Sequence, residues 1–223
     1  VGAVAMQNNT TGEYSIAMGR FALNDNSTGC RNVALGYATM LSNTTASHNT
    51  AVGSCALYTN TTGIKNDAFG FKALQANTTG CCNTASGSYA LALNTTGCKN
   101  VAIGGSALYT ACANNNTAVG YHAACSTTTG GANTAIGSHA LLSNTTATVN
   151  TAVGYFAMYK NTTGSENTAS GAYALSCNTS ASYNTAMGYK AACLTTGALN
   201  AAFGRTALSS NSTGSQNTAL GAQ

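Results

Sequence analysis

The stretch from Asn150 to Glu166 reads Asn-Thr-Ala-Val-Gly-Tyr-Phe-Ala-Met-Tyr-Lys-Asn-Thr-Thr-Gly-Ser-Glu, and close variants of it fill the chain. The glycine of Asn-Thr-Ala-x-Gly marks each repeat. It recurs with a 17-residue period, which shortens twice to a 16-residue interval. The marker glycines are Gly2, Gly19, Gly36, Gly53, Gly70, Gly87, Gly104, Gly120, Gly137, Gly154, Gly171, Gly188, Gly204 and Gly221. A fixed period of this length is typical of a solenoid in which each repeat forms one coil.

The local chemistry of the repeat favours β-structure. Gly or Asn-Thr interrupts every helix-length stretch, which opposes a helix. The chain has no Pro, as expected where every coil donates backbone N–H groups to its neighbour. We therefore expect an all-β parallel β-solenoid (β-roll) of about 13 stacked 17-residue coils, with two short strands and two turns per coil. Residues 1–223 would form one tandem-repeat domain, and we interpret it as a fragment of a longer fibre because both ends fall inside a repeat.

Composition excludes several classes of protein. Charged residues make up only 5% of the chain, whereas disordered chains are rich in charge and poor in apolar residues. No run of about 18 apolar residues occurs, so we expect no membrane insertion in this segment. The eight basic residues are scattered, and no two adjoin. Nucleic-acid binding needs a basic stripe, so we do not expect it.

Positions are numbered below from the marker glycine, so that −2 is the second residue before it and +4 the fourth residue after it. Position −2 is always Ala, position −1 is apolar except at Ser86 and Ser170, and position +4 is Leu, Met or Ala. Residues −2 and −1 of a strand face opposite sides. Ala would fit inside a narrow coil, leaving Val, Ile or Leu at −1 as an apolar stripe that needs a partner surface, such as a closed trimer. In the alternative, the large residues lie inside a single-chain coil and Ala lies outside.

Stacking places like residues above one another. The Asn at position −4 can therefore form an amide ladder in which each side chain binds the next. Its members are Asn32, Asn49, Asn66, Asn83, Asn100, Asn116, Asn133, Asn150, Asn167, Asn184, Asn200 and Asn217.

The Asn at position +7 opens an Asn-x-Thr or Asn-x-Ser sequon, which is also ordinary turn chemistry. These asparagines are Asn9, Asn26, Asn43, Asn60, Asn77, Asn94, Asn144, Asn161, Asn178 and Asn211. We expect an outer turn here that could accommodate N-linked glycans, although a purely structural turn is the plainer interpretation.

Nine cysteines occur without zinc-binding spacing, and no metal site is predicted. Cys81 and Cys98 share a position in adjacent coils, so their separation should suit a disulfide. Cys30, Cys55, Cys177 and Cys193 have no neighbour at the same position. Many cysteines in exposed turns favour an oxidising, extracellular compartment.

No catalytic motif is found, and we expect neither an enzyme nor a cofactor. His122 and His139 share a position in adjacent coils, where they could stack or bind a metal. Aromatic residues recur at +1 and +2: Tyr37, Phe71, Tyr121, Tyr155 and Tyr189, with Phe21, Tyr89, Phe156 and Tyr173 beside them. Stacking between coils is the expected role, and an exposed row that binds sugars is the alternative.

Repeats such as Asn150–Gly164 resemble those of long bacterial surface proteins and phage tail-fibre-like proteins. The Asn-x-Ala-x-Gly core is also similar to the head repeats of trimeric autotransporter adhesins, which are shorter than the repeat of this chain. This resemblance covers the whole chain and implies a left-handed β-roll that assembles as a homotrimer at a cell or virion surface.

The expected function is that of a structural extracellular fibre or spacer, which stacks its coils and associates laterally. One alternative is an adhesin or receptor-binding fibre that contacts carbohydrate, with surface glycans as partners. A second alternative is ice binding, because flat Thr arrays on solenoids can match ice. No strict Thr-x-Thr face appears, however.

Overall fold

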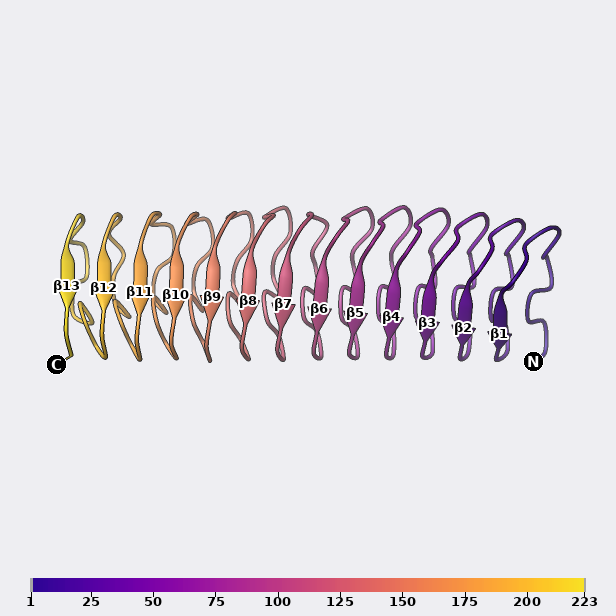
Figure 1. The fold of residues 1–223 in the computed structure, drawn as a ribbon, viewed down its shortest axis with the longest axis horizontal. Helices are drawn as coiled ribbons and strands as arrows, with labels where there is room; N and C mark the ends of the chain where they lie inside the picture. Colours follow the sequence, from indigo (N-terminus) through magenta and orange to yellow (C-terminus); the bar gives the residue numbers. More distant parts are fainter. Residues whose placement is uncertain (1, 223) are drawn as a thin grey trace. The chain divides into compact units, whose positions relative to one another are not determined.

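The computed structural model describes residues 2–222, which form an all-β parallel solenoid without a helix. The chain forms two compact units, Val1–Asn114 (unit 1) and Asn115–Gln223 (unit 2). Within each unit, consecutive strands lie side by side in chain order (Figure 1). Unit 1 contains β1 (Ile16–Met18), β2 (Val33–Leu35), β3 (Thr50–Val52), β4 (Asp67–Phe69), β5 (Thr84–Ser86) and β6 (Val101–Ile103). Unit 2 contains β7 (Thr117–Val119), β8 (Thr134–Ile136), β9 (Thr151–Val153), β10 (Thr168–Ser170), β11 (Thr185–Met187), β12 (Ala201–Phe203) and β13 (Thr218–Leu220).

The register follows the repeat. Ala34 of β2 pairs with Ala51 of β3, and Ala51 pairs with Ala68 of β4, all in parallel. The predicted parallel solenoid, in which each repeat forms one coil, is therefore confirmed. Its predicted left-handedness and its continuity as one domain remain predictions.

The interior of each coil is narrow and built from small side chains. The central Ala of the eleven strands from β2 to β12 is fully buried, and so are Leu57 and its equivalents at +4 from Leu23 to Leu175. The residues that flank each Ala on the strand are half-buried or exposed. The interpretation that places the Ala at −2 inside the coil is correct. The alternative, in which the large residues at −1 lie inside and Ala lies outside, is wrong. Burying one Leu side chain contributes about 1.5–3 kcal/mol.

The expectation of two strands per coil is wrong, because each coil has one strand and the rest is a series of turns. The reason is the backbone at +2, +4 and +12, where non-glycine residues adopt positive φ. In one coil these are Cys55 (φ 58°), Leu57 (φ 50°) and Lys65 (φ 57°). Such residues interrupt extended structure and cost about 1–2 kcal/mol each.

Bonds between coils stabilise these strained residues. The N–H of Cys55 donates to Tyr37 O at 2.9 Å, that of Leu57 to Ala73 O at 3.0 Å, and that of Lys65 to Ser47 O at 3.3 Å. Each strained residue thus satisfies its backbone donor in a neighbouring coil. An isolated coil would lack these partners, so the turn conformation depends on stacking.

Steric contact with the next coil excludes any other residue at the marker glycine. Gly53 has φ of 135°, and a Cβ added to it would lie 2.4 Å from the carbonyl oxygen of Gly70. The strand end and the following turn therefore approach the next coil more closely than any side chain allows.

Candidate functional site

The predicted Asn ladder at position −4 is present in the interior. The backbone N–H of Asn49 donates to Asn32 Oδ1 at 3.0 Å. The Nδ2 of Asn49 donates to the same oxygen at 3.4 Å and to Gly63 O at 2.9 Å. At the end of the sheet, the Asn32 side chain thus accepts the hydrogen bond that a backbone carbonyl accepts within the sheet. All members from Asn32 to Asn200 are buried, and Asn217 in the last coil is half-buried.

A second Asn ladder, which the sequence did not reveal, runs through the sequons at position +7. Asn60 Nδ2 donates to Asn43 Oδ1 at 3.1 Å and to Gly63 O at 3.0 Å. Asn77 Nδ2 then donates to Asn60 Oδ1 at 2.8 Å. Both side-chain N–H groups of Asn60 are therefore in use inside the coil.

The expected outer turn with room for glycans is wrong in the folded coil. A glycan on Nδ2 would remove one N–H and place a sugar in the closed interior. The fully buried sequon asparagines are Asn26, Asn43, Asn60, Asn77, Asn94, Asn144, Asn161 and Asn178. Asn9 and Asn211, in the outermost coils, are half-buried and donate to Gly12 O and Gly214 O.

The 16-residue coil from Gly188 to Gly204 interrupts this second ladder. Thr195 occupies position +7 there, and its buried Oγ1 makes no hydrogen bond to a described residue. The buried Nδ2 of Asn184 is also unpaired, whereas Asn167 at the same position donates to Ala181 O at 2.9 Å. Each unsatisfied buried group costs about 1–3 kcal/mol. The shortened coil is therefore a local weak point of unit 2.

Outside, position −1 forms the apolar stripe on the strands. Its members are Met18, Leu35, Val52, Phe69 and Ile103 in unit 1, and Val119, Ile136, Val153, Met187, Phe203 and Leu220 in unit 2. Ile103 is 43% exposed and Met187 is 44% exposed, although the Ala next to each is fully buried. Ser86 and Ser170 interrupt the stripe once in each unit. These apolar side chains are therefore left at least partly exposed by the single chain.

The aromatic ridge of unit 2 occupies positions +1 and +2. Its members are Tyr121, His122, His139, Tyr155, Phe156, Tyr173 and Tyr189. At +2 the rings of His139 and Phe156 stack at 4.8 Å, and those of Phe156 and Tyr173 at 5.7 Å. The predicted stacking between coils is confirmed.

The +1 rings of the aromatic ridge remain open to solvent. Tyr121 is 56% exposed, Tyr155 is 49% exposed and Tyr189 is 42% exposed. The +1 tyrosines are therefore exposed rings beside the stacked +2 rings.

His122 and His139 meet within this ridge, with ring centroids 5.6 Å apart. Burial, and secondarily the charge of His139, lower the pKa of His122 below its ordinary value. No group of three His, Cys, Asp or Glu side chains among residues 2–222 could hold a metal ion.

Cys81 and Cys98 lie together as the sequence predicts, with their Sγ atoms 2.8 Å apart. Both are thiols in the structure, as are the other seven cysteines. The hydrogen bond to Cys98, followed by burial, raises the pKa of Cys81 to about 11. The disulfide itself stays a prediction. Cys177, which has no neighbour at its own position, donates its N–H to Cys193 O at 3.0 Å.

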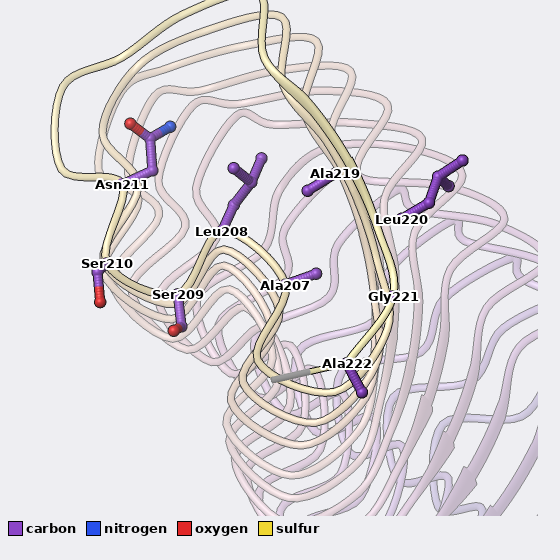
Figure 2. A pocket seen from close by; sticks show the side chains of 9 residues that line it. All are labelled: Ala207, Leu208, Ser209, Ser210, Asn211, Ala219, Leu220, Gly221 and Ala222. Carbon is purple, nitrogen blue, oxygen red and sulfur yellow. The ribbon is translucent and has the colours of Figure 1, made fainter.

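A cavity of about 340 Å³ lies at the last described coil, between Ala207–Asn211 and Ala219–Ala222. Figure 2 shows Leu208 and Ala219 projecting into the coil while Leu220 projects away from it. This space is the same Ala- and Leu-lined interior that the next coil covers elsewhere in unit 2. Its lining residues contain no ionisable side chain, so we assign it no binding role.

Comparison with known protein families, with curated proteins and with solved structures found no match for this chain. Within residues 2–222, no helix has the length and apolar character needed to cross a membrane. Function must therefore be argued from the ladders and surfaces described above.

Proposed function

We propose that this chain is a non-catalytic structural segment of an extracellular fibre or spacer, which associates laterally with copies of itself. The buried Asn columns serve mainly to join one coil to the next, and the outward columns of residues 2–222 show repeated side chains rather than a single localised site. The apolar stripe is the observation that carries the proposal, because each monomer leaves this file of large side chains half-exposed.

The homotrimer is the assembly that we favour. Three copies packed around one axis would place three apolar stripes against one another and remove them from water. Each fully buried Val, Ile or Phe would then contribute about 1.5–3 kcal/mol. The resemblance to trimeric adhesin repeats points to the same assembly.

Sedimentation or light scattering of the purified chain tests this assembly. We expect about three times the monomer mass of 22.2 kDa. Ile103→Ser, Ile136→Ser and Val153→Ser together should give monomers, and Ser86 and Ser170 show that the coil accepts Ser at this position. The control is Val149→Ser with Leu199→Ser, which are exposed but off the stripe. A native monomer, or a stripe variant that stays trimeric, would contradict the proposal.

In an oxidising compartment we further propose a Cys81–Cys98 disulfide. The two thiols would lose two hydrogen atoms to a disulfide oxidant such as oxidised glutathione, which is reduced to two thiols. The contact of 2.8 Å between the sulfur atoms supports this pairing. Intact mass should fall by two hydrogen atoms, and peptide mapping should link the two residues. Cys81→Ser is the control, and a map that leaves Cys98 unmodified would refute the pair.

Contact with carbohydrate through the aromatic ridge is a second candidate function, favoured by the exposure of Tyr121, Tyr155 and Tyr189. Changing these three residues to Ala should abolish binding to the neutral glycans of an array. Tyr183→Ala, at a tyrosine that is 55% exposed but off the ridge, should leave binding intact. Equal loss in both variants would argue against the ridge.

A further inference from the structure

Unit 1 brings cations that are far apart in the sequence into one file at position +12. Arg31, His48, Lys65 and Lys99 occupy this position in the consecutive coils of unit 1, with Cys82 between the two lysines. We call these four basic residues the cationic column. All four are exposed. The apparent scatter of basic residues in the sequence therefore hides a cluster whose members are one or two repeats apart.

Backbone bonds hold the cationic column in register. The N–H of Arg31 donates to Glu13 O at 2.9 Å, that of His48 to Cys30 O at 3.1 Å, and that of Lys99 to Cys81 O at 3.0 Å. Each residue of the column has a positive φ between 56° and 62°. The bonded backbone of each coil thus fixes where the next cation emerges.

The charges of the cationic column are not neutralised internally. Arg31, Lys65 and Lys99 form no ion pair with a carboxylate of the described residues. The acids of unit 1 occupy other positions of the repeat: Glu13 lies at +11, Asp25 at +6 and Asp67 at −3. Arg31 lies 5.7 Å from the ring centroid of Tyr14, which continues the file at +12 in the preceding coil.

The spacing of these charges indicates the partner. Coils stack at about 4.8 Å, so Arg31, Lys65 and Lys99 recur at about 9.6 Å along a straight line. Duplex DNA carries one charge every ~1.7 Å of its axis, which is a much closer spacing than that of the column. The cations of the column would therefore contact only a few of its phosphates. Single strands require aromatic platforms between the cations, which the column lacks beyond Tyr14. A linear polysaccharide with one acidic group on every second sugar has a charge density closer to that of the column.

We propose that the cationic column of unit 1 binds a linear anionic polysaccharide. The guanidinium of Arg31 and the ammonium groups of Lys65 and Lys99 would contact successive acidic groups, and the His48 ring would add a hydrogen-bond donor. This surface is separate from both the apolar stripe and the aromatic ridge. Unit 2 has no basic residue at this position, where it carries Ala132, Val149, Glu166 and Tyr183.

Hyaluronan oligosaccharide, which carries one carboxylate per disaccharide, is the probe, measured by calorimetry at pH 7 and low salt. The test variant is Arg31→Ala, Lys65→Ala and Lys99→Ala together. Ala132 already occupies this position at φ of 57°, so Ala is compatible with the backbone. The control is Lys160→Ala, Lys190→Ala and Arg205→Ala, which removes the same charges from unit 2.

We expect the column variant to bind on the order of 100-fold more weakly, since each of the three basic residues near an anionic surface contributes about fivefold in affinity. The control variant should stay within about threefold of the native chain, and binding should weaken as salt increases. Circular dichroism verifies that both variants fold. Absence of hyaluronan binding by the native chain, or equal losses in the two variants, would overturn the proposal. Tighter binding of single-stranded DNA than of hyaluronan at the same salt would overturn the assignment to polysaccharide.

Discussion

Unit 1 and unit 2 share one coil design but differ in the second Asn ladder. In unit 1 the ladder runs unbroken from Asn9 to Asn94, with bonds between side chains of 2.7 to 3.1 Å, and ends at the buried Ala111. In unit 2, Thr replaces Asn at 127 and 195, and the bonds from Asn144 and Asn161 lengthen to 3.4 Å. The difference shows that the coil survives without this amide, at the cost of looser bonds and unpaired polar atoms.

The outward columns of the two units differ in a second way. Both units carry aromatic residues at +1 and +2, such as the Phe71 and Tyr89 rings of unit 1, whose centroids lie 5.3 Å apart, but only unit 1 presents the cationic column at +12. The buried Ala at −2 and the buried Asn at −4 are the same in both units. The two proposed binding surfaces therefore rest on exposed positions, whose residues vary while the stacking is kept.

The marker glycines should be equally critical in both units. Gly53→Ala and Gly154→Ala should each destabilise the chain by roughly 3–5 kcal/mol, because φ near 135° and a contact below 3 Å leave no room for Cβ. Urea unfolding measures the change. Ser54→Ala, next to Gly53, is the control and should shift stability by no more than about 0.5 kcal/mol. A mild effect in only one unit would show that the two units do not share the same constraint.

The Asn ladder should be stronger in unit 1 than in unit 2. Asn60→Ala removes three side-chain bonds of 2.8 to 3.1 Å and should cost about 2–3 kcal/mol. Asn144→Ala removes three bonds of 3.3 to 3.4 Å and should cost about 1 kcal/mol less. Urea midpoints of the two variants give the comparison, and a larger loss at Asn144 would reverse our interpretation of the bond lengths.

The two Thr replacements in unit 2 should respond in opposite directions. Thr195→Val removes a buried hydroxyl that has no partner and should stabilise the chain by about 1 kcal/mol. Thr127→Val removes the acceptor of the Asn144 amide and should destabilise it by about 1 kcal/mol. Thermal unfolding under identical conditions measures both. If both variants lose stability, Thr195 has a role that its buried position does not reveal.

The smallest effect concerns pH and is confined to unit 2. The pKa of His122 is lowered in the folded state, so the unfolded chain binds a proton more readily. Stability should therefore be complete above the ordinary His pKa of about 6.5 and should fall slightly as pH decreases below it. NMR titration of His122 checks the shift. His139→Gln should raise the pKa of His122 only partly, because burial is the larger cause; a complete return to the ordinary value would contradict that ranking.

The stacking of like residues predicted the interior correctly at positions where the direction of the side chain follows from the strand alone. The Ala at −2 and the Asn at −4 lie in the interior, as the stacking of like residues predicts. The residues on either side of each of them point outward. The same reasoning failed for the sequons. Asn-Thr-Thr-Gly is a surface-turn motif in most chains, and only the fold of this coil directs the Asn at +7 inward.

The candidate surfaces were only partly visible in the sequence. The recurrence of the aromatic positions is visible in the sequence, which leaves open whether their rings are buried or exposed. The cationic column is not visible among neighbours in the sequence, because its members lie one or two repeats apart. Sorting the basic residues by their position in the 17-residue period would have aligned Arg31, Lys65 and Lys99 at once.

By itself, the amino-acid sequence determined the period, the parallel stacking and the identity of each column, because a repeat of fixed length can only superimpose like on like. Tertiary structure decided which columns face inward, where the turns lie and how many strands each coil has. The reason is physical. The left-handed residues at +2, +4 and +12 are unfavourable within a single coil and are held in place by hydrogen bonds to residues about one repeat away.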